Sequence, residues 1–269
     1  MTTQIQEDAN DSSNLVSVDK VPTGPFEHLR DALPVLSDFE IRQKLLQWNL
    51  SDTLQLKRFR VHRQLPSESD EALLTEFFQD ISVQQALSVR TAKEVSGVSS
   101  LQFERLRVNV TSMAFFEKME AAGIVSRDGS LRGCIDEDFD GCTASDLLTE
   151  MTVNPNSDNC DVFSDEDRQE FIFQLFSALV IGGGALRQAD SRVQAYENVT
   201  RTLYRALVSV KKSVADANGK RSIEITSRVY RVSGDALFQA PSRFHSCFAI
   251  VDARKRWLTV WYCPFRASW

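Results

Sequence analysis

The residues best suited to metal binding or acid–base chemistry are spread along the chain without the spacing of a ligand pair or a catalytic pair. The histidines are His28, His62 and His245, and the cysteines are Cys134, Cys142, Cys160, Cys247 and Cys263. No H-x-x-x-H or C-x-x-C pair occurs, so the sequence predicts neither a zinc site nor a disulfide framework. A couple of His245 with Cys247 or Cys134 stays open, although a free cysteine is more often a small buried apolar group.

An acidic motif begins like a calcium loop and then departs from that pattern. Residues 136–141 read Asp-Glu-Asp-Phe-Asp-Gly and match the opening D-x-D-x-D-G. The twelfth position of the loop, where calcium needs a bidentate Glu, is Leu147. A solvated acidic turn is therefore favoured over a calcium site at Asp136–Asp140, and no cofactor is predicted.

Three consecutive glycines, Gly182 to Gly184, could in principle cradle a phosphate. Phosphate loops follow a strand and open a helix, whereas these glycines follow a predicted helix and no Gly-Lys-Ser/Thr comes after them. A helix end that permits close packing is the favoured interpretation. With no G-x-S-x-G or kinase signature, the sequence predicts a protein that is not an enzyme. An enzyme that binds a cofactor at this turn or at the acidic motif is the alternative.

One basic ribbon interrupts an otherwise acidic chain. It lies in an extended segment over residues 54–65 and contains Lys57, Arg58, Arg60 and Arg63. Contact with an acidic partner and protection of an exposed sheet edge are equally compatible with such a pattern. An RNA-binding module that uses residues 57–63, with bases stacked on Phe59, is a further alternative. The formal net charge of −6 opposes it, so no nucleic acid partner is expected.

Elements that could position these residues follow from periodicity and capping residues. Helices are predicted from Ser37 to Trp48, Glu71 to Gln79, Ser112 to Ala122, Phe163 to Ile181 and Ser191 to Leu207. Strands are predicted over residues 54–65, 101–110, 208–214, 223–232, 244–251 and 257–263. The last four are expected to form an antiparallel meander.

The fold class that these elements predict is α+β, with helices packed against a C-terminal antiparallel sheet. Residues 26–269 are expected to form one domain, helix-rich to about residue 207 and strand-rich over 208–269. Residues 1–25 are polar and are expected to form a disordered tail. No apolar run of 18 residues and no signal peptide occur, so a cytosolic protein without membrane contact is expected.

Several of these segments resemble the cilia- and flagella-associated protein 300 family, from about Trp48 to Tyr262. The most specific is Phe163-Ser164-x-x-Asp167-Arg168-x-Glu170-Phe171-x-Phe173-x-Leu175-Phe176-x-x-Leu179, followed by Gly183-Gly184-Ala185-Leu186-x-Gln188. Others are Ser112-Met113-x-Phe115-Phe116, Tyr204-x-x-Leu207-Val208-Ser209-Val210 and Phe248-x-Ile250-Val251-Asp252.

This resemblance implies a non-enzymatic adaptor needed to assemble axonemal dynein arms and to deliver them by intraflagellar transport. The implied partners are cytoplasmic dynein-arm assembly factors, axonemal dynein subunits and the intraflagellar transport machinery. The implied location is the cytoplasm and the axoneme of motile cilia or flagella. The resemblance does not locate the docking surface, so the prediction of a contact with an acidic partner rests on Lys57, Arg58, Arg60 and Arg63.

Overall fold

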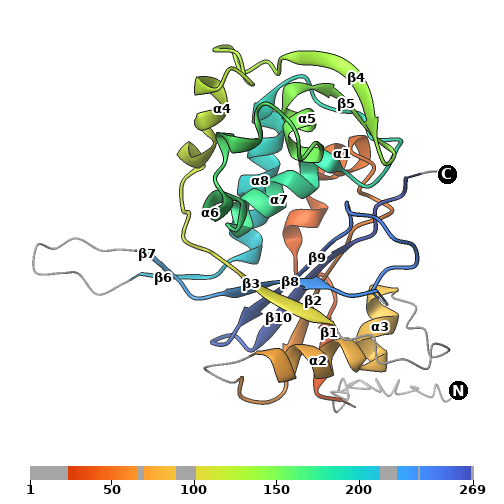
Figure 1. Ribbon diagram of the computed structural model, residues 1–269. Coiled ribbons are helices and arrows are strands. Elements are labelled where there is room, and N and C mark those ends of the chain that lie inside the picture. Colours follow the sequence, from red (N-terminus) through yellow and green to blue (C-terminus); the bar gives the residue numbers. More distant parts are fainter. Residues whose placement is uncertain (1–23, 66–69, 89–100, 213–222, 236, 268–269) are drawn as a thin grey trace, which may run out of the picture.

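The computed structural model describes residues 24–65, 70–88, 101–212, 223–235 and 237–267. Most of the tail expected over residues 1–25, namely residues 1–23, lies outside the described residues. The chain forms three layers, in which one antiparallel sheet lies between a large upper group of helices and two lower helices (Figure 1). The α+β class predicted from the sequence is confirmed.

The central sheet has the order β1-β2-β10-β9-β8-β3, and every neighbouring pair is antiparallel. Its strands are β1 (Phe26–Leu29), β2 (Gln55–Val61), β3 (Gln102–Leu106), β8 (Arg228–Ser233), β9 (Ser246–Asp252) and β10 (Trp257–Cys263). Of the expected four-stranded meander, β8, β9 and β10 are neighbours, whereas the strand expected over residues 208–214 pairs with residues 223–225 in a separate hairpin. The sheet is nevertheless not confined to the C-terminal part, because three of its strands come from the first 106 residues.

Side chains alternate between the two faces of this sheet, and both faces are covered. On β10, Leu258 and Val260 face the lower helices while Thr259 and Trp261 face the upper ones. Because water reaches neither face, nearly every residue of β9 and β10 is buried. This explains why both strands read as almost continuous apolar runs.

The upper layer contains most of the helices. They are η1 (Pro34–Ser37), α1 (Phe39–Gln47), η2 (Met113–Phe116), α4 (Lys118–Ala121), α5 (Leu147–Val153), η3 (Cys160–Val162), α6 (Asp165–Arg168), α7 (Phe171–Ile181) and α8 (Val193–Leu207). Helix α7 packs against α5 and α8 and lies over the sheet (Figure 1). That position accounts for its lack of a polar face.

The single helix expected from Phe163 to Ile181 is divided into α6 and α7. The predicted capping box of Ser164 and Asp167 starts α6. The chain then becomes extended at Glu170, whose carboxylate accepts hydrogen bonds from the backbone and side-chain amides of Asn109. The Phe171 amide donates to the Arg107 carbonyl, so the break attaches this helix to the segment after β3.

The lower layer consists of α2 (Glu71–Gln79) and α3 (Ile81–Leu87). Two small hairpins complete the described structure, β4 (Gly133–Phe139) with β5 (Cys142–Asp146), and β6 (Val210–Lys212) with β7 (Ile223–Ile225). Within the described residues, each helix is too short or too polar to span a bilayer.

Candidate functional site

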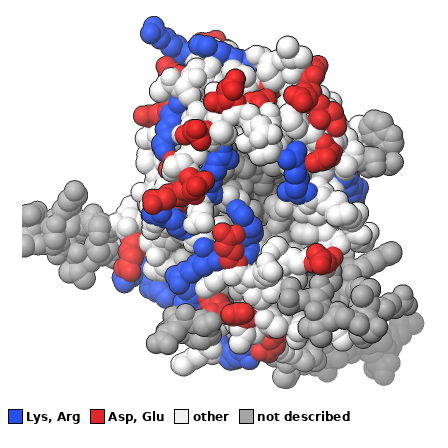
Figure 2. Space-filling model, in the orientation of Figure 1, with Lys and Arg blue, Asp and Glu red and all other residues white. Residues whose placement is uncertain are grey.

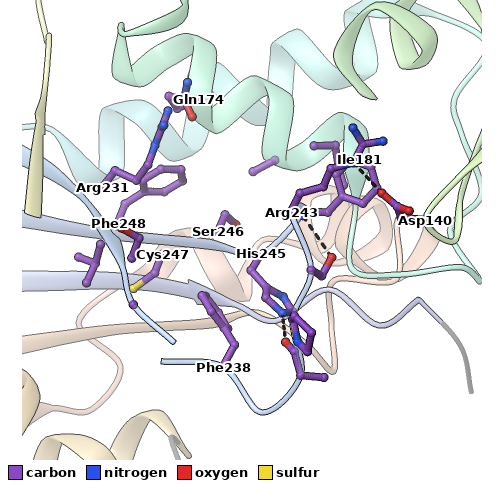
Figure 3. A pocket seen from close by; sticks show the side chains of 18 of the residues that line it. Asp140, Gln174, Ile181, Arg231, Phe238, Arg243, His245, Ser246, Cys247 and Phe248 are labelled. Carbon is purple, nitrogen blue, oxygen red and sulfur yellow. Dashed lines mark hydrogen bonds and ion pairs between the residues drawn. The ribbon is translucent and has the colours of Figure 1, made fainter. Parts of the chain in front are cut away.

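A hollow lies between the second half of α7 and the connection from β8 to β9 (Figure 3). Its volume is about 1150 Å³. Helix α7 contributes Gln174, Ser177, Ala178 and Ile181 to one wall, and Phe248 of β9 lies on the other. We call this the α7–β9 groove.

The histidine of the groove is held in one neutral form by two hydrogen bonds. The Phe265 amide donates to Nδ1 of His245 at 2.9 Å, so Nε2 carries the proton and donates to the Ala240 carbonyl at 2.6 Å. The ring also stacks on Phe238, with the centroids 4.1 Å apart. Burial lowers the pKa of His245. Both nitrogens are occupied by the fold, which leaves neither for acid–base work.

The cysteine of the groove is equally unsuited to nucleophilic chemistry. Cys247 is 1% exposed, and burial raises the pKa of its thiol. In the described part of the chain no hydrogen bond joins it to His245. The other thiol considered, Cys134, lies in the β4–β5 hairpin, where burial first and nearby acids second raise its pKa. The Cys-His couple is therefore not formed.

Two charged side chains of the groove, Arg231 and Arg243, form ion pairs, whereas Asp235, which also lines it, has none among the described residues. Nε of Arg243 lies 2.7 Å from Oδ2 of Asp140, and Nη1 of Arg231 lies 3.3 Å from Oε2 of Glu104. Figure 2 shows the same interleaving of basic and acidic side chains over this whole face of the molecule. One polar atom is left over: among the described residues, no partner reaches the buried Oγ of Ser177. The groove thus has an apolar wall and two paired arginines at its rim.

The acidic motif forms the β4–β5 hairpin. Asp140 and Gly141 have φ values of 50° and 86°, as required at the centre of a tight hairpin turn, and Asp138 accepts from the Gly141 amide. Along β4, Asp136 and Asp138 share one face and Glu137 lies on the other. No group of three His, Cys, Asp or Glu side chains that could hold a metal occurs in the described ranges. The predicted turn is present at Asp140 and Gly141.

The glycine turn is filled by the chain itself. The Gly183 amide donates to the Trp48 carbonyl at 3.0 Å, and a Cβ at Gly183 would overlap the Asn49 carbonyl oxygen. Gly184 pairs with Arg266. The predicted helix end with close packing is confirmed, and this turn has no space for a phosphate.

The basic ribbon is an interior strand of the sheet, because β2 lies between β1 and β10. The interpretation of residues 57–63 as a protected sheet edge is therefore wrong. Arg58 is 8% exposed and donates to the hydroxyl of Thr259 at 3.0 Å and to the carbonyls of Ala32 at 3.1 Å and Ala206 at 2.9 Å. Its guanidinium lies 4.6 Å from the ring centre of Trp257. Arg58 is an internal anchor of the fold.

The remaining cations of the ribbon do not share a surface. Lys57 lies on the lower face of β2, and Arg60 is exposed on the upper face. Arg63 forms an ion pair with the exposed Glu76. Phe59 is 0% exposed, so it has no ring surface on which an RNA base could stack. The RNA-binding alternative loses its aromatic platform.

Comparison with known proteins decides the family. A family model for cilia- and flagella-associated protein 300 matches residues 23–263. The chain belongs to this family. A relative from Chlamydomonas reinhardtii, named cilia- and flagella-associated protein 300, is 27% identical over 248 residues, covering 87% of this chain and 95% of the relative. One of the same name from Paramecium tetraurelia is 27% identical over 216 residues, covering 80% and 83%. No solved structure matches.

Membership in the cilia- and flagella-associated protein 300 family confirms the resemblance seen in the sequence and associates the chain with cilia and flagella. Family motif residues Asp167 and Glu170 have structural roles, one in a capping box and the other at the break before α7. The groove residues Ser177 and Arg243 were missed by sequence reasoning. The only available signal was a serine within an otherwise apolar helix.

Proposed function

We propose that this protein is a non-enzymatic adaptor for the assembly of outer and inner axonemal dynein arms and for their delivery by intraflagellar transport. It acts in the cytoplasm and in the axoneme of motile cilia or flagella. Family membership supports a ciliary role. The bonding of His245 and the burial of Cys247 support a binding role, because the imidazole and the thiol of the α7–β9 groove are both engaged in the fold.

The observation that carries this proposal is the α7–β9 groove. We infer that it holds an extended segment of a dynein-arm assembly factor or dynein subunit. An apolar side chain of that segment packs on Ala178, Ile181 and Phe248. Removing this apolar surface from water favours the bound state.

The cellular test is deletion of the gene in a flagellated cell, followed by electron microscopy of axoneme cross-sections. The proposal expects outer and inner arms to be missing. Intact arms on all doublets would contradict it.

The molecular test is the exchange Ile181→Glu, which puts a charge on the apolar wall of the groove. The matched control is Leu186→Glu, since Leu186 is 60% exposed and does not line the groove. Co-precipitation of dynein heavy chains and intraflagellar transport proteins, detected by immunoblot, should be lost with the first variant and kept with the second. Circular dichroism confirms that both fold. Retained co-precipitation with a folded Ile181→Glu would exclude the groove.

A further inference from the structure

A second hollow lies where the β1–β2 ladder ends. Its volume is about 360 Å³, and its polar lining includes His28, Arg30, Asp31 and Lys57. We call it the β1–β2 hollow. His28 pairs with Phe59, and Leu29 with Arg58 is the last pair of the ladder, so Arg30 begins the turn that follows β1. Since alternate residues share a face, His28 and Lys57 both lie on the lower side of these two strands, and Arg30 lines the hollow from the turn.

This arrangement concentrates positive charge that the fold does not neutralise. Among the described residues, neither Arg30 nor Lys57 has an ion pair, and Asp31 is the one acidic side chain that lines the hollow. Helix α3, which packs beneath β1 and β2, has no charged residue. A bound anion would interact favourably with both cations.

The imidazole of His28 is also affected by the positive charges that line this hollow. Burial, then the positive charge of Lys57, then that of Arg30 lower the pKa of its imidazole. The ring is therefore neutral at pH 7 and offers one N–H as a donor. An anion between these three side chains would reverse the electrostatic contribution, which makes His28 a natural reporter of occupancy.

The hollow is held in shape from above by Arg58. This side chain also lines it, but its three donor nitrogens are bonded to Thr259, Ala32 and Ala206. The bond to the Ala32 carbonyl fixes the turn that follows Arg30, where Asp31 has a φ of 56°. Arg58 therefore acts as a positioning residue, and the free donors are those of His28, Arg30 and Lys57.

We propose that the β1–β2 hollow binds a phosphoryl group carried by a serine or threonine of a partner protein. Such a group has a charge of about −1.5 to −2 and three acceptor oxygens, which match two fixed cations and three donors. A carboxylate has half that charge, and a run of carboxylates would need cations spaced along a surface. An anionic membrane is disfavoured because the chain has a net charge of −6. This inference rests on the β1–β2 ladder alone and is independent of the dynein-arm proposal.

The first test is an NMR titration of the histidine side chains of the full chain with N-acetyl-O-phosphoserine amide. The pKa of His28 should rise on binding, whereas His245, in the α7–β9 groove, should not respond. The unphosphorylated serine amide should have no effect. Inorganic phosphate that binds as tightly as the phosphoserine probe would contradict a protein-borne ligand, and so would preferential binding to vesicles containing phosphatidylinositol phosphates.

The second test compares variants by fluorescence anisotropy with a labelled phosphoserine peptide. Arg30→Gln and Lys57→Gln should each weaken binding by about tenfold or more, as expected for a lost charge-assisted hydrogen bond. Arg60→Gln is the matched control, because Arg60 lies on the same strand and the opposite face, and it should bind like the wild type. Thermal unfolding of Lys57→Gln should occur at the wild-type temperature, since Lys57 forms no ion pair among the described residues that the exchange would remove. Unchanged binding by both variants would overturn the proposal.

Discussion

The two faces of the central sheet each enclose an arginine, and they neutralise it differently. On the lower face, Arg228 meets the fully buried carboxylate of Asp70, with Nε–Oδ2 and Nη2–Oδ1 distances of 2.6 and 2.7 Å. The hydroxyl of Tyr230 donates to the same carboxylate at 2.9 Å. On the upper face, Arg58 is surrounded by carbonyls, a hydroxyl and an indole ring.

Comparing Arg228 with Arg58 shows two ways of holding an arginine inside the fold: an ion pair with a carboxylate, or hydrogen bonds to neutral groups. Hydrogen bonding to Asp70 raises the pKa of Arg228, whereas burial lowers the pKa of Arg58. The charge of Arg228 is cancelled within the core. That of Arg58 has no carboxylate bonded to it in the described structure, and it adds to the positive field of the neighbouring β1–β2 hollow.

Removing the carboxylate should have the largest effect on stability. Asp70→Ala leaves Arg228 buried without its counter-charge, and we expect a loss of about 3–5 kcal/mol in the free energy of unfolding. Urea denaturation followed by circular dichroism measures it. Glu76→Ala, which removes an exposed carboxylate from the same helix, is the control. Equal losses for the two variants would show that the Arg228–Asp70 pair contributes no more to the free energy of unfolding than a surface ion pair does.

Replacing Arg58, whose donors bond to neutral groups, should have an intermediate effect on the free energy of unfolding. Arg58→Met fills the space but leaves the Ala32 and Ala206 carbonyls without their donor, so we expect a loss of about 2–3 kcal/mol. Arg60→Met on the same strand should change the free energy of unfolding by less than about 0.5 kcal/mol. A loss at Arg58 as large as that at Asp70 would remove the distinction between the two faces.

Alkaline pH should weaken the lower face through Tyr230. Burial and the neighbouring Asp70 raise its pKa to about 12, so above pH 10 the unfolded chain loses this proton before the folded protein does. The folded form then binds more protons, and stability falls as pH rises from 10 to 12. Tyr230→Phe should lower stability at pH 7 and remove about 1 kcal/mol of that alkaline loss. Urea denaturation at a series of pH values tests this, and an unchanged slope would contradict it.

The smallest effect on stability is expected from the exposed ion pair between Arg63 and Glu76 in the lower layer. Arg63 and Glu76 are both about half exposed, and a double-mutant cycle should give a coupling below about 1 kcal/mol that declines further in salt. A larger coupling would mean that exposure is a poor guide to the strength of these pairs.

Local features of this fold could be predicted from the sequence. Helix α2 has the predicted bounds, and Ser164 caps α6 as expected, because both depend on neighbouring residues. The first helix begins one residue later than expected, since Asp38 and not Ser37 caps it. Strand β1 was missed: its four residues follow a polar segment, and its pairing with β2 depends on residues far along the chain.

The site could be predicted only where its chemistry is local. The acidic turn and the glycine helix end follow from short motifs. The burial of Arg58 could not be predicted, because its partners are Thr259 and Ala206, about 150 to 200 residues away. Alternating basic and apolar residues look the same in an exposed strand and in one whose arginine is bonded inside the protein.

Strand β10 has a consequence for the synthesis of the protein. It is the last strand among the described residues, yet it lies between β2 and β9 and joins the two halves of the sheet. A nascent polypeptide that has not yet emerged from the ribosome through Cys263 has the β1–β2 pair and the β3-β8-β9 group with unpaired inner edges. A stop codon shortly before Trp257 would therefore leave two parts of the sheet with open edges, which are prone to aggregation.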